Sequence, residues 1–151
     1  MQKVLPLDRY SYVVASHNKA FAVCKRLFDI VASAVLLVVF LPVSLVVALI
    51  AAVDTKGSPI FVQTRMGRGN RPFKMLKFRT MYVDTPADVP TYQLANAEAC
   101  ISRTGAILRK LSLDELPQLW NILKGDMSFV GPRPVVLTEK ELLGRRSRNG
   151  A

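Results

Sequence analysis

The feature that most constrains the fold is an uncharged run from Ile30 to Val53, inside the segment KRLFDIVASAVLLVVFLPVSLVVALIAAVD. Its 24 residues are enough for one helix to cross a bilayer. Pro42 lies in the middle of the run, where a proline removes a backbone hydrogen bond and kinks a helix. The run therefore predicts either a kinked transmembrane helix or a helix that breaks at Pro42 and returns to the side from which it came.

Basic residues flank this run on both sides: Lys25 and Arg26 before it, and Lys56, Arg65, Arg68 and Arg71 after it. Because basic flanks favour the cytoplasmic side, the simplest topology returns both ends to that side. On the residues alone, the re-entrant helix and the kinked span are equally supported. Backbone groups freed at a break need partners among neighbouring side chains, for which the Ser44 hydroxyl is a candidate. We also expect Asp29 to pair with Lys25 or Arg26 at headgroup depth.

The net charge of +10 predicts an anionic partner. Half of the residues are hydrophobic, which favours a membrane surface with anionic lipids over nucleic acid. Aromatic residues are not interleaved with the basic ones, as stacking on bases would require, so we expect no nucleic-acid partner.

Cys24 and Cys100 give neither a disulfide framework nor a zinc spacing, and His17 is the single histidine. Any bound metal should therefore be a hard ion held by oxygen.

Residues 58–81, SPIFVQTRMGRGNRPFKMLKFRTM, predict two strands joined by a glycine-rich turn. In the second strand, alternation places Lys77 and Arg79 on one face, about 7 Å apart. Seven basic residues and a single acid, Asp54, lie between positions 54 and 81. This surface is either a solvated face or, as we slightly favour, one that binds phosphates or headgroups.

The following segments predict short helices. Residues 82–100 contain prolines and acids without a clear period, which indicates a loop with a short helical piece. The segment SRTGAILRKL at 102–111 predicts a short helix or turn that brings Arg109 next to an acid pair. Residues 112–124 have helical apolar spacing, and Gly125 is a suitable C-terminal stop.

The segment LSLDELPQLWN at 111–121 places Asp114 and Glu115 side by side in an apolar run. One interpretation is structural, because Ser112-x-x-Glu115 matches a capping box and acids are favourable in the first turn of a helix. The other is chemical. Four cations could converge on this place and leave capacity for phosphate: Arg103, Arg109, Lys110 and Arg133. On this segment alone, capping is slightly favoured.

A carboxylate beside a bound phosphate can act in two ways. It can hold a divalent ion that bridges to the phosphate oxygens, or it can attack phosphorus and form an acyl phosphate. Downstream, Gly131-Pro132-Arg133-Pro134 predicts a stiff extended stretch, since each proline fixes φ and restricts its predecessor. An arginine held between two prolines suits a directed phosphate clamp.

Together these segments resemble the bacterial sugar transferase family, the small monotopic phosphoglycosyl transferases. The resemblance runs from Lys25 to about Pro134. It rests on KRLFDI at 25–30, the proline-broken apolar helix, KFRTM at 77–81 and LSLDELPQLWNILKGDMSFVGPRP at 111–134. It implies an enzyme that moves a sugar-1-phosphate from a nucleotide diphosphate sugar to polyprenyl (undecaprenyl) phosphate, which initiates exopolysaccharide, capsule, O-antigen or glycoprotein glycan assembly. The implied location is the bacterial inner membrane, with the catalytic domain on its cytosolic face.

The resemblance also implies roles for individual residues. Asp114 would be the nucleophile that forms a covalent aspartyl-phosphosugar intermediate, and Glu115 its partner in metal binding or positioning. Magnesium is the expected ion, held by Asp114 and Glu115. Four cations would bind the substrate phosphates: Lys77, Arg79, Arg109 and Arg133. Nearby cations should favour the ionised form of Asp114 at neutral pH.

The expected fold is α+β and mostly helical. It comprises an N-terminal interfacial segment at 1–24, a re-entrant membrane helix at 25–54 broken at Pro42, and a small cytosolic catalytic domain at 55–151 with a β-hairpin and amphipathic helices. Leu41 stands where the family commonly has a serine before the proline. Family members continue past the GPRP motif, so we expect a chain truncated at its C-terminus. A catalytically inactive, membrane-anchored homologue that acts only in binding is the alternative, and homo-oligomerisation stays open.

Overall fold

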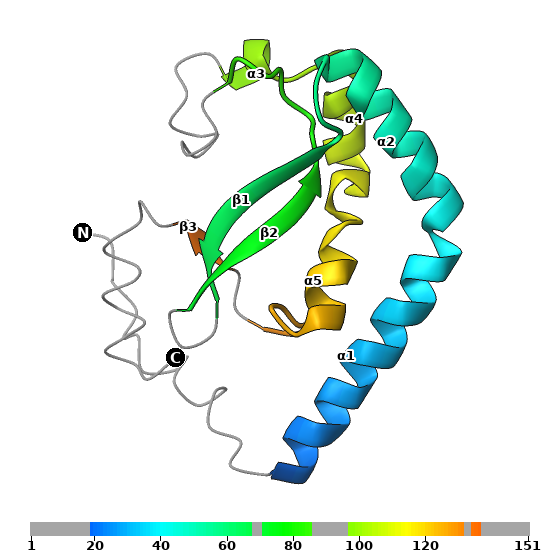
Figure 1. The fold of residues 1–151 in the computed structure, drawn as a ribbon, viewed down its shortest axis with the longest axis vertical. Helices are drawn as coiled ribbons and strands as arrows, with labels where there is room; N and C mark the ends of the chain where they lie inside the picture. Colours follow the sequence, from blue (N-terminus) through cyan, green and yellow to red (C-terminus); the bar gives the residue numbers. More distant parts are fainter. Residues whose placement is uncertain (1–18, 68–70, 86–96, 132–133, 137–151) are drawn as a thin grey trace, which may run out of the picture.

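The computed structural model describes residues 19–67, 71–85, 97–131 and 134–136. Its elements, in chain order, are α1 (Lys19–Val39), α2 (Leu41–Thr55), β1 (Ile60–Met66), β2 (Pro72–Phe78), α3 (Ala97–Cys100), α4 (Arg103–Lys110), the 3₁₀ turn η4 (Leu113–Glu115), α5 (Gln118–Lys124) and β3 (Val135–Val136). The bent pair α1–α2 runs along one side, and α4 and α5 lie between it and the hairpin (Figure 1). The α+β, mostly helical prediction is confirmed, whereas nearly all of the expected interfacial segment lies outside the described residues.

The axes of α1 and α2 are bent by 65° where the two helices meet at Phe40. Pro42 lies in the first turn of α2, where its missing N–H is tolerated. Backbone hydrogen bonds run across the bend, from Phe40 N–H to Leu36 O (2.9 Å) and from Ser44 N–H to Phe40 O (2.8 Å). The Ser44 hydroxyl makes no hydrogen bond to any described residue, so its predicted role at the break is wrong.

Taken one at a time, none of the described helices has the length and apolarity needed to cross a membrane. The bent pair reaches that length and composition only when its two helices are counted together. Pro42 lies two residues after Phe40, at the bend of this pair, as the sequence predicts.

The hairpin predicted for residues 58–81 is confirmed. β1 and β2 are antiparallel, and their register runs from Ile60 opposite Phe78 to Met66 opposite Pro72. The short β3, which the sequence does not predict, pairs with the other edge of β1, so the strand order is β2-β1-β3.

A side chain of α5 covers the outer edge of β2. Asn121 is 2% exposed; its Oδ1 accepts from Leu76 N–H (3.0 Å), and its Nδ2 donates to Lys74 O (2.8 Å). The amide therefore supplies the pair of bonds that a neighbouring strand would make with an open edge. The main-chain oxygen of Asn121 accepts from Gly125 N–H (3.1 Å), and Gly125 ends α5 with a φ of 96°, as predicted.

Polar side chains of α1 fasten it to the end of α5. Arg26 donates from Nη1 to Ile122 O and from Nη2 to Leu123 O, both at 2.7 Å. These carbonyls belong to the last turn of α5, where acceptors outnumber the helix's own donors; Ile122 O also accepts from Gly125 N–H (3.0 Å). Lys25, next to Arg26, pairs with the buried Asp29 one turn further along α1 (3.4 Å), so the predicted ion pair is confirmed with Lys25 and not with Arg26.

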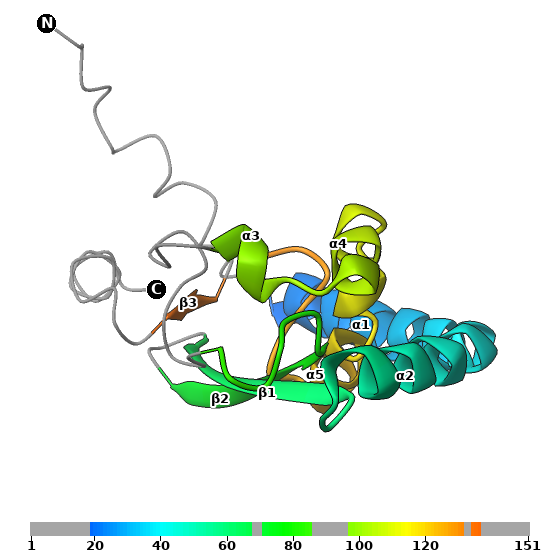
Figure 2. The same cartoon turned by 90° about the horizontal axis from the view of Figure 1, so that it is seen from above.

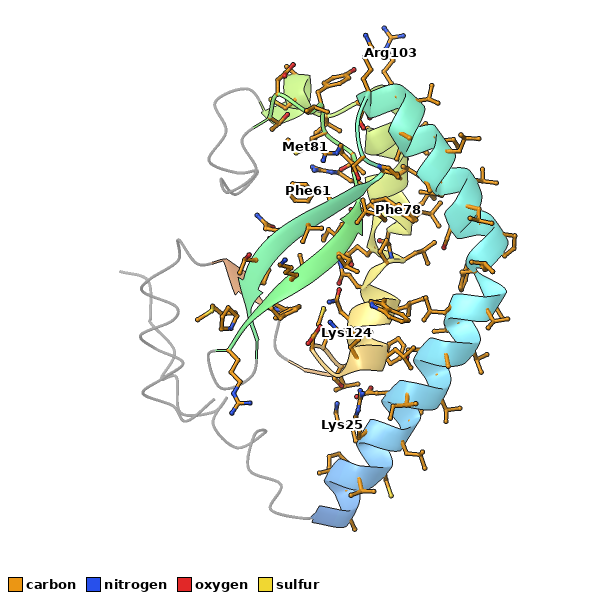
Figure 3. The ribbon with its side chains drawn as sticks, in the orientation of Figure 1. Lys25, Phe61, Phe78, Met81, Arg103 and Lys124 are labelled. Atoms are coloured by element: carbon orange, nitrogen blue, oxygen red, sulfur yellow. The ribbon has the colours of Figure 1, made fainter. Side chains whose placement is uncertain are left out.

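A small apolar core joins α2, β2 and α4 through Val47, Phe78 and Leu108, all buried. The Phe78 side chain lies at the end of β2 beside the helices (Figure 3), and α2 and α4 lie next to each other in the view from above (Figure 2). Leu113 and Leu116 pack against this core from either end of η4. The core therefore fixes the turn that carries the acid pair.

Replacing Asn121 by alanine should lower the free energy of unfolding by about 1–3 kcal/mol, because Leu76 N–H and Lys74 C=O lose their partners. Thermal unfolding in detergent micelles measures the change. Lys124→Gln, an exposed substitution on the same helix, should stay within about 0.5 kcal/mol. An alanine variant as stable as the parent would contradict the edge-covering role.

Pro42→Ala should reduce the bend, because alanine restores a backbone donor and removes the ring clash. Spin labels at the exposed Leu27 and Val53 report it in a chain that carries Cys24→Ser and Cys100→Ser. In a straight helix with a rise of 1.5 Å per residue, the labels would lie about 6 Å further apart than across the bend. Pulsed electron paramagnetic resonance in nanodiscs gives that distance. No lengthening would mean that packing against α4 and α5 imposes the bend.

Candidate active site

Ser112 lies between the end of α4 and the acid pair. This residue has a φ of 57°, a left-handed conformation that is unfavourable for residues other than glycine. Its side chain makes no capping hydrogen bond, so the predicted capping box is wrong. Instead the backbone closes a 3₁₀ turn, with Glu115 N–H donating to Ser112 O (3.2 Å). The helix predicted over 112–124 is therefore divided into η4 and α5, and Pro117 precedes the first turn of α5.

The two acids of η4 lie in different environments. Asp114 is buried at 7% exposure, whereas the Glu115 side chain is 45% exposed. Lys77 of β2 reaches Glu115, with 2.7 Å between Nζ and Oε1. Among the described residues, Asp114 makes no direct ion pair. One carboxylate thus faces the interior, and the other faces solvent and a lysine.

Arg109 reaches the same region from the last turn of α4. Its guanidinium is half-buried, and Nε donates to Oγ1 of the buried Thr80 (2.7 Å), just beyond β2. Its charge is near enough to Asp114 for each group to shift the pKa of the other. The neighbouring Lys110 is exposed at the end of the helix. The structure therefore brings Lys77, Arg109 and both acids together from three separate segments.

Burial raises the pKa of Asp114 above its ordinary value of 3.8. Lys77 opposes this rise, the carboxylate of Glu115 adds to it, and Arg109 opposes it. Desolvation therefore outweighs the two cations, and the pKa shift runs opposite to the direction that cations alone would give. Burial also lowers the pKa of Arg109, against the influence of Asp114, but an arginine stays charged at neutral pH.

Two of the other predicted cations are not seen at Asp114: one is engaged by other groups and one lies at the far end of α4. Arg79 donates from Nε to Ser58 O (2.9 Å), and its guanidinium lies over the Phe61 ring, 5.8 Å from the ring centre. Arg103 extends from the opposite end of α4 (Figure 3), so its expected convergence on the acids is wrong. Arg133 lies outside the described residues, and its phosphate role stays a prediction.

The acid pair is where the sequence predicts a magnesium ion. No group of three or more histidine, cysteine, aspartate or glutamate side chains within the described ranges is arranged to hold a metal. Magnesium, however, is commonly held by one or two carboxylates and completes its shell with water and substrate phosphates. Asp114 and Glu115 are the adjacent carboxylates that this mode would use, but in this structure Asp114 is buried and Glu115 is bonded to Lys77, so magnesium binding stays a prediction.

Sequence reasoning missed Thr80 and Asn121. Thr80 lies inside the KFRTM segment, in which the lysine and the arginine are the residues that predict phosphate binding. The Thr80 hydroxyl gains a partner only because the Arg109 side chain of α4 reaches it in the folded chain. Asn121 gave a clearer signal, as an amide among apolar residues on a helix, and such a side chain usually bonds to the backbone when it is buried.

Asp114→Asn should raise the free energy of unfolding at pH 7 in the absence of divalent cations, because it removes a buried charge. The folded state binds the Asp114 proton more tightly than the unfolded state, so the parent loses stability as pH rises from about 3.8 through the folded pKa. Each unit of pKa shift corresponds to about 1.4 kcal/mol. Thermal melts with EDTA between pH 3 and 8 should compare the stability of the asparagine variant with that of the parent. The difference should be small at pH 3, grow as the pH rises, and reach a plateau above the folded pKa of Asp114.

Glu115→Gln is the matched control, since it removes the exposed acid and should bring no such gain. An asparagine variant that is less stable than the parent at pH 7 would contradict the dominance of burial at Asp114.

Sequence comparisons relate the chain to known proteins. The sequence model of the bacterial sugar transferases matches residues 20–149. A UDP-glucose:undecaprenyl-phosphate glucose-1-phosphate transferase from Caulobacter vibrioides is 48% identical over 112 residues, which are 73% of this chain and 41% of that protein. An undecaprenyl-phosphate glucose phosphotransferase from Komagataeibacter xylinus is 44% identical over 110 residues, 73% of this chain and 21% of that protein.

A Bacillus subtilis relative, provisionally named an undecaprenyl-phosphate N-acetylgalactosaminyl 1-phosphate transferase, is 35% identical over 147 residues. That alignment covers 94% of this chain and 82% of the relative. The chain thus spans less than half of the Caulobacter and Komagataeibacter proteins and most of the Bacillus one. The family match includes the bent helix pair, the hairpin and the acid pair, and it confirms the resemblance seen in the sequence: the chain belongs to the bacterial sugar transferase family.

Proposed function

We propose that this chain is a phosphoglycosyl transferase that moves a sugar-1-phosphate from a nucleotide diphosphate sugar to undecaprenyl phosphate, the first step of a surface glycan such as an exopolysaccharide. The observation that carries the proposal is the placement of Asp114, a buried carboxylate with Lys77, Arg109 and Glu115 around it. The names of the relatives support the reaction class. They include transferases of glucose phosphate and N-acetylgalactosamine phosphate and an exopolysaccharide production protein.

The reaction would proceed in two displacements at one phosphorus. An oxygen of the Asp114 carboxylate attacks the phosphorus on the sugar side of the diphosphate. The bond from that phosphorus to the bridging oxygen breaks, and the nucleoside monophosphate leaves with that oxygen. An oxygen of undecaprenyl phosphate then attacks the acyl phosphate, which releases the Asp114 carboxylate and forms an undecaprenyl diphosphate sugar.

Phosphoryl transfer depends mainly on positioning and on neutralising charge. Lys77 and Arg109 are close enough to Asp114 to act on the pKa of its carboxyl. Phosphate oxygens brought to that carboxylate would therefore lie near both cations. Magnesium bound through Asp114, Glu115 and the substrate oxygens would neutralise further phosphate charge. Arg79 and Arg133 complete the proposed phosphate ligands, although Arg79 is engaged at Ser58 in the structure described above.

We further propose that α1 and α2 form a re-entrant anchor in the bacterial inner membrane, with the site on its cytosolic face. The bend of 65° allows both ends of the pair to return to one side. Its outward apolar side chains are exposed: Leu27, Phe28, Val31, Val35, Val38, Val39, Leu41, Leu45, Val46, Leu49 and Val53. Anionic headgroups would neutralise the basic residues near both ends of the pair. Such an anchor would hold the site at the depth of a lipid phosphate acceptor.

Covalent capture tests the proposal. The chain in nanodiscs is mixed with magnesium and, separately, with UDP-glucose, UDP-galactose and UDP-N-acetylgalactosamine, and the intact protein is weighed. We expect one donor to add the mass of its sugar phosphate, at a site that peptide mapping assigns to Asp114. Undecaprenyl phosphate should then remove the adduct. Asp114→Asn should reduce adduct formation by about 10³-fold or more, as loss of a nucleophile does.

Asp84→Asn, which changes an exposed aspartate outside the site, is the matched control and should form the adduct at the parental rate. The Caulobacter relative treated in parallel checks the donors and the membrane preparation. If that relative forms an adduct while the chain forms none with any donor, the transferase proposal is wrong and the binding-only homologue becomes the better account.

A further inference from the structure

Thr80 is held rigidly by the start of α4. It is 5% exposed, and its carbonyl oxygen accepts from Ser102 N–H (3.1 Å). Ser102 is the N-cap of α4, and its hydroxyl accepts from Gly105 N–H (3.0 Å). A Cβ at Gly105 would lie 2.2 Å from Thr80 O, so the backbone of α4 approaches Thr80 more closely than any side chain allows. The next residue along the chain, Met81, forms an isolated β-bridge with Ile101.

The hydroxyl of Thr80 binds the other end of the same helix. Side chains in an α-helix point back towards its N-terminus, and Arg109 follows this rule by reaching back to Thr80. The bond from Arg109 Nε to Thr80 Oγ1 is 2.7 Å long, which is short for a nitrogen donor. Thr80 thus fixes α4 with its backbone and the Arg109 side chain with its hydroxyl.

This bond determines which edge of the guanidinium is available. Nε is engaged by Thr80, while Nη1 and Nη2 of Arg109 donate to no residue that the structure describes. An arginine binds two oxygens of a phosphate or carboxylate through two parallel N–H groups. With Nε occupied, that pair must be Nη1 and Nη2, at the tip of the side chain, and the plane of the group is set by Thr80.

We propose that Thr80 is a positioning residue for the transfer reaction: its hydroxyl holds Arg109 so that the Nη1–Nη2 edge faces the phosphate that approaches Asp114. This role rests on the proposed function, because it assumes a phosphate at Asp114. Arg109 makes the contact, and Thr80 acts through Arg109.

The test compares three variants. Thr80→Val has nearly the shape of threonine but lacks the hydroxyl, and Thr80→Ser keeps the hydroxyl. Thr104→Val is the matched control, since it removes another threonine hydroxyl of the α4 region, one bonded to Asp54 and not to Arg109. General loss of stability in this part of the chain should affect the two valine variants alike.

The first measurement does not depend on turnover. In the ¹⁵N-labelled chain without donor, the hydrogen exchange rate of Arg109 Nε–H reports the bond to Thr80. We expect exchange in Thr80→Val to be at least about tenfold faster than in the parent, the change for one lost hydrogen bond to a charged group. Thr80→Ser and Thr104→Val should exchange at the parental rate. An unchanged rate in Thr80→Val overturns the role of Thr80, whatever the chain catalyses.

The second measurement is the rate of phosphosugar adduct formation against donor concentration. Thr80→Val should lower the rate at saturating donor by about 10–100-fold with a smaller change in half-saturation, because orientation acts mainly in the transition state. Thr80→Ser should restore the rate. Thr80→Val should have no further effect in an Arg109→Gln chain, because both changes remove the same interaction. Multiplying effects would overturn the proposal. A parent that forms no adduct on any donor, while the Caulobacter relative forms one in parallel, would overturn the proposed function itself.

Discussion

Phe78 packs between Val47 of α2 and Leu108 of α4, and the candidate site depends on this contact. Each of the three side chains comes from a different segment, so the core forms only when the bent pair, the hairpin and α4 meet. Leu113 and Leu116 extend the core to both ends of η4. The acid pair is therefore positioned by apolar packing, and the polar residues around it supply charge and orientation.

That packing has an electrostatic consequence. Asp114 is buried in the turn that these leucines fix, and its desolvation raises the pKa of its carboxyl despite Lys77 and Arg109. A buried carboxylate lowers the stability of the fold when it ionises, yet the proposed reaction needs the ionised form. In that proposal, stability and activity are opposed at one residue, as they often are at functional sites. Glu115 avoids this conflict because it is exposed and paired with Lys77.

The bent pair also holds both helices that flank the acid turn, each at the end whose charge it complements. Arg26 of α1 binds the last carbonyls of α5, where the helix dipole is negative. Asp54 of α2 accepts from the Thr104 N–H (3.3 Å) in the first turn of α4, where the dipole is positive. A tilt of the proposed anchor would therefore be transmitted to α4 and α5 together.

The sequence by itself determined the elements whose signals are local. The apolar run and Pro42 gave the bent pair, alternation and the glycine-rich turn gave the hairpin, and Gly125 gave the end of α5. The motif around Asp114 gave the family. These features follow from periodicity and backbone restriction, which neighbouring residues are enough to express.

Only the tertiary structure decided what surrounds Asp114. The capping box was wrong because Ser112 adopts a left-handed conformation in which its side chain makes no capping bond. Arg79 is engaged by Ser58 O, and Arg103 lies at the start of α4, at the other end of that helix from Arg109. Thr80, Arg26 and Asn121 acquired their partners from segments distant in the chain. The short β3 depends on pairing with β1 for the same reason. Hydrogen bonds and burial at long range depend on how the elements pack, and no local pattern in the sequence encodes that packing.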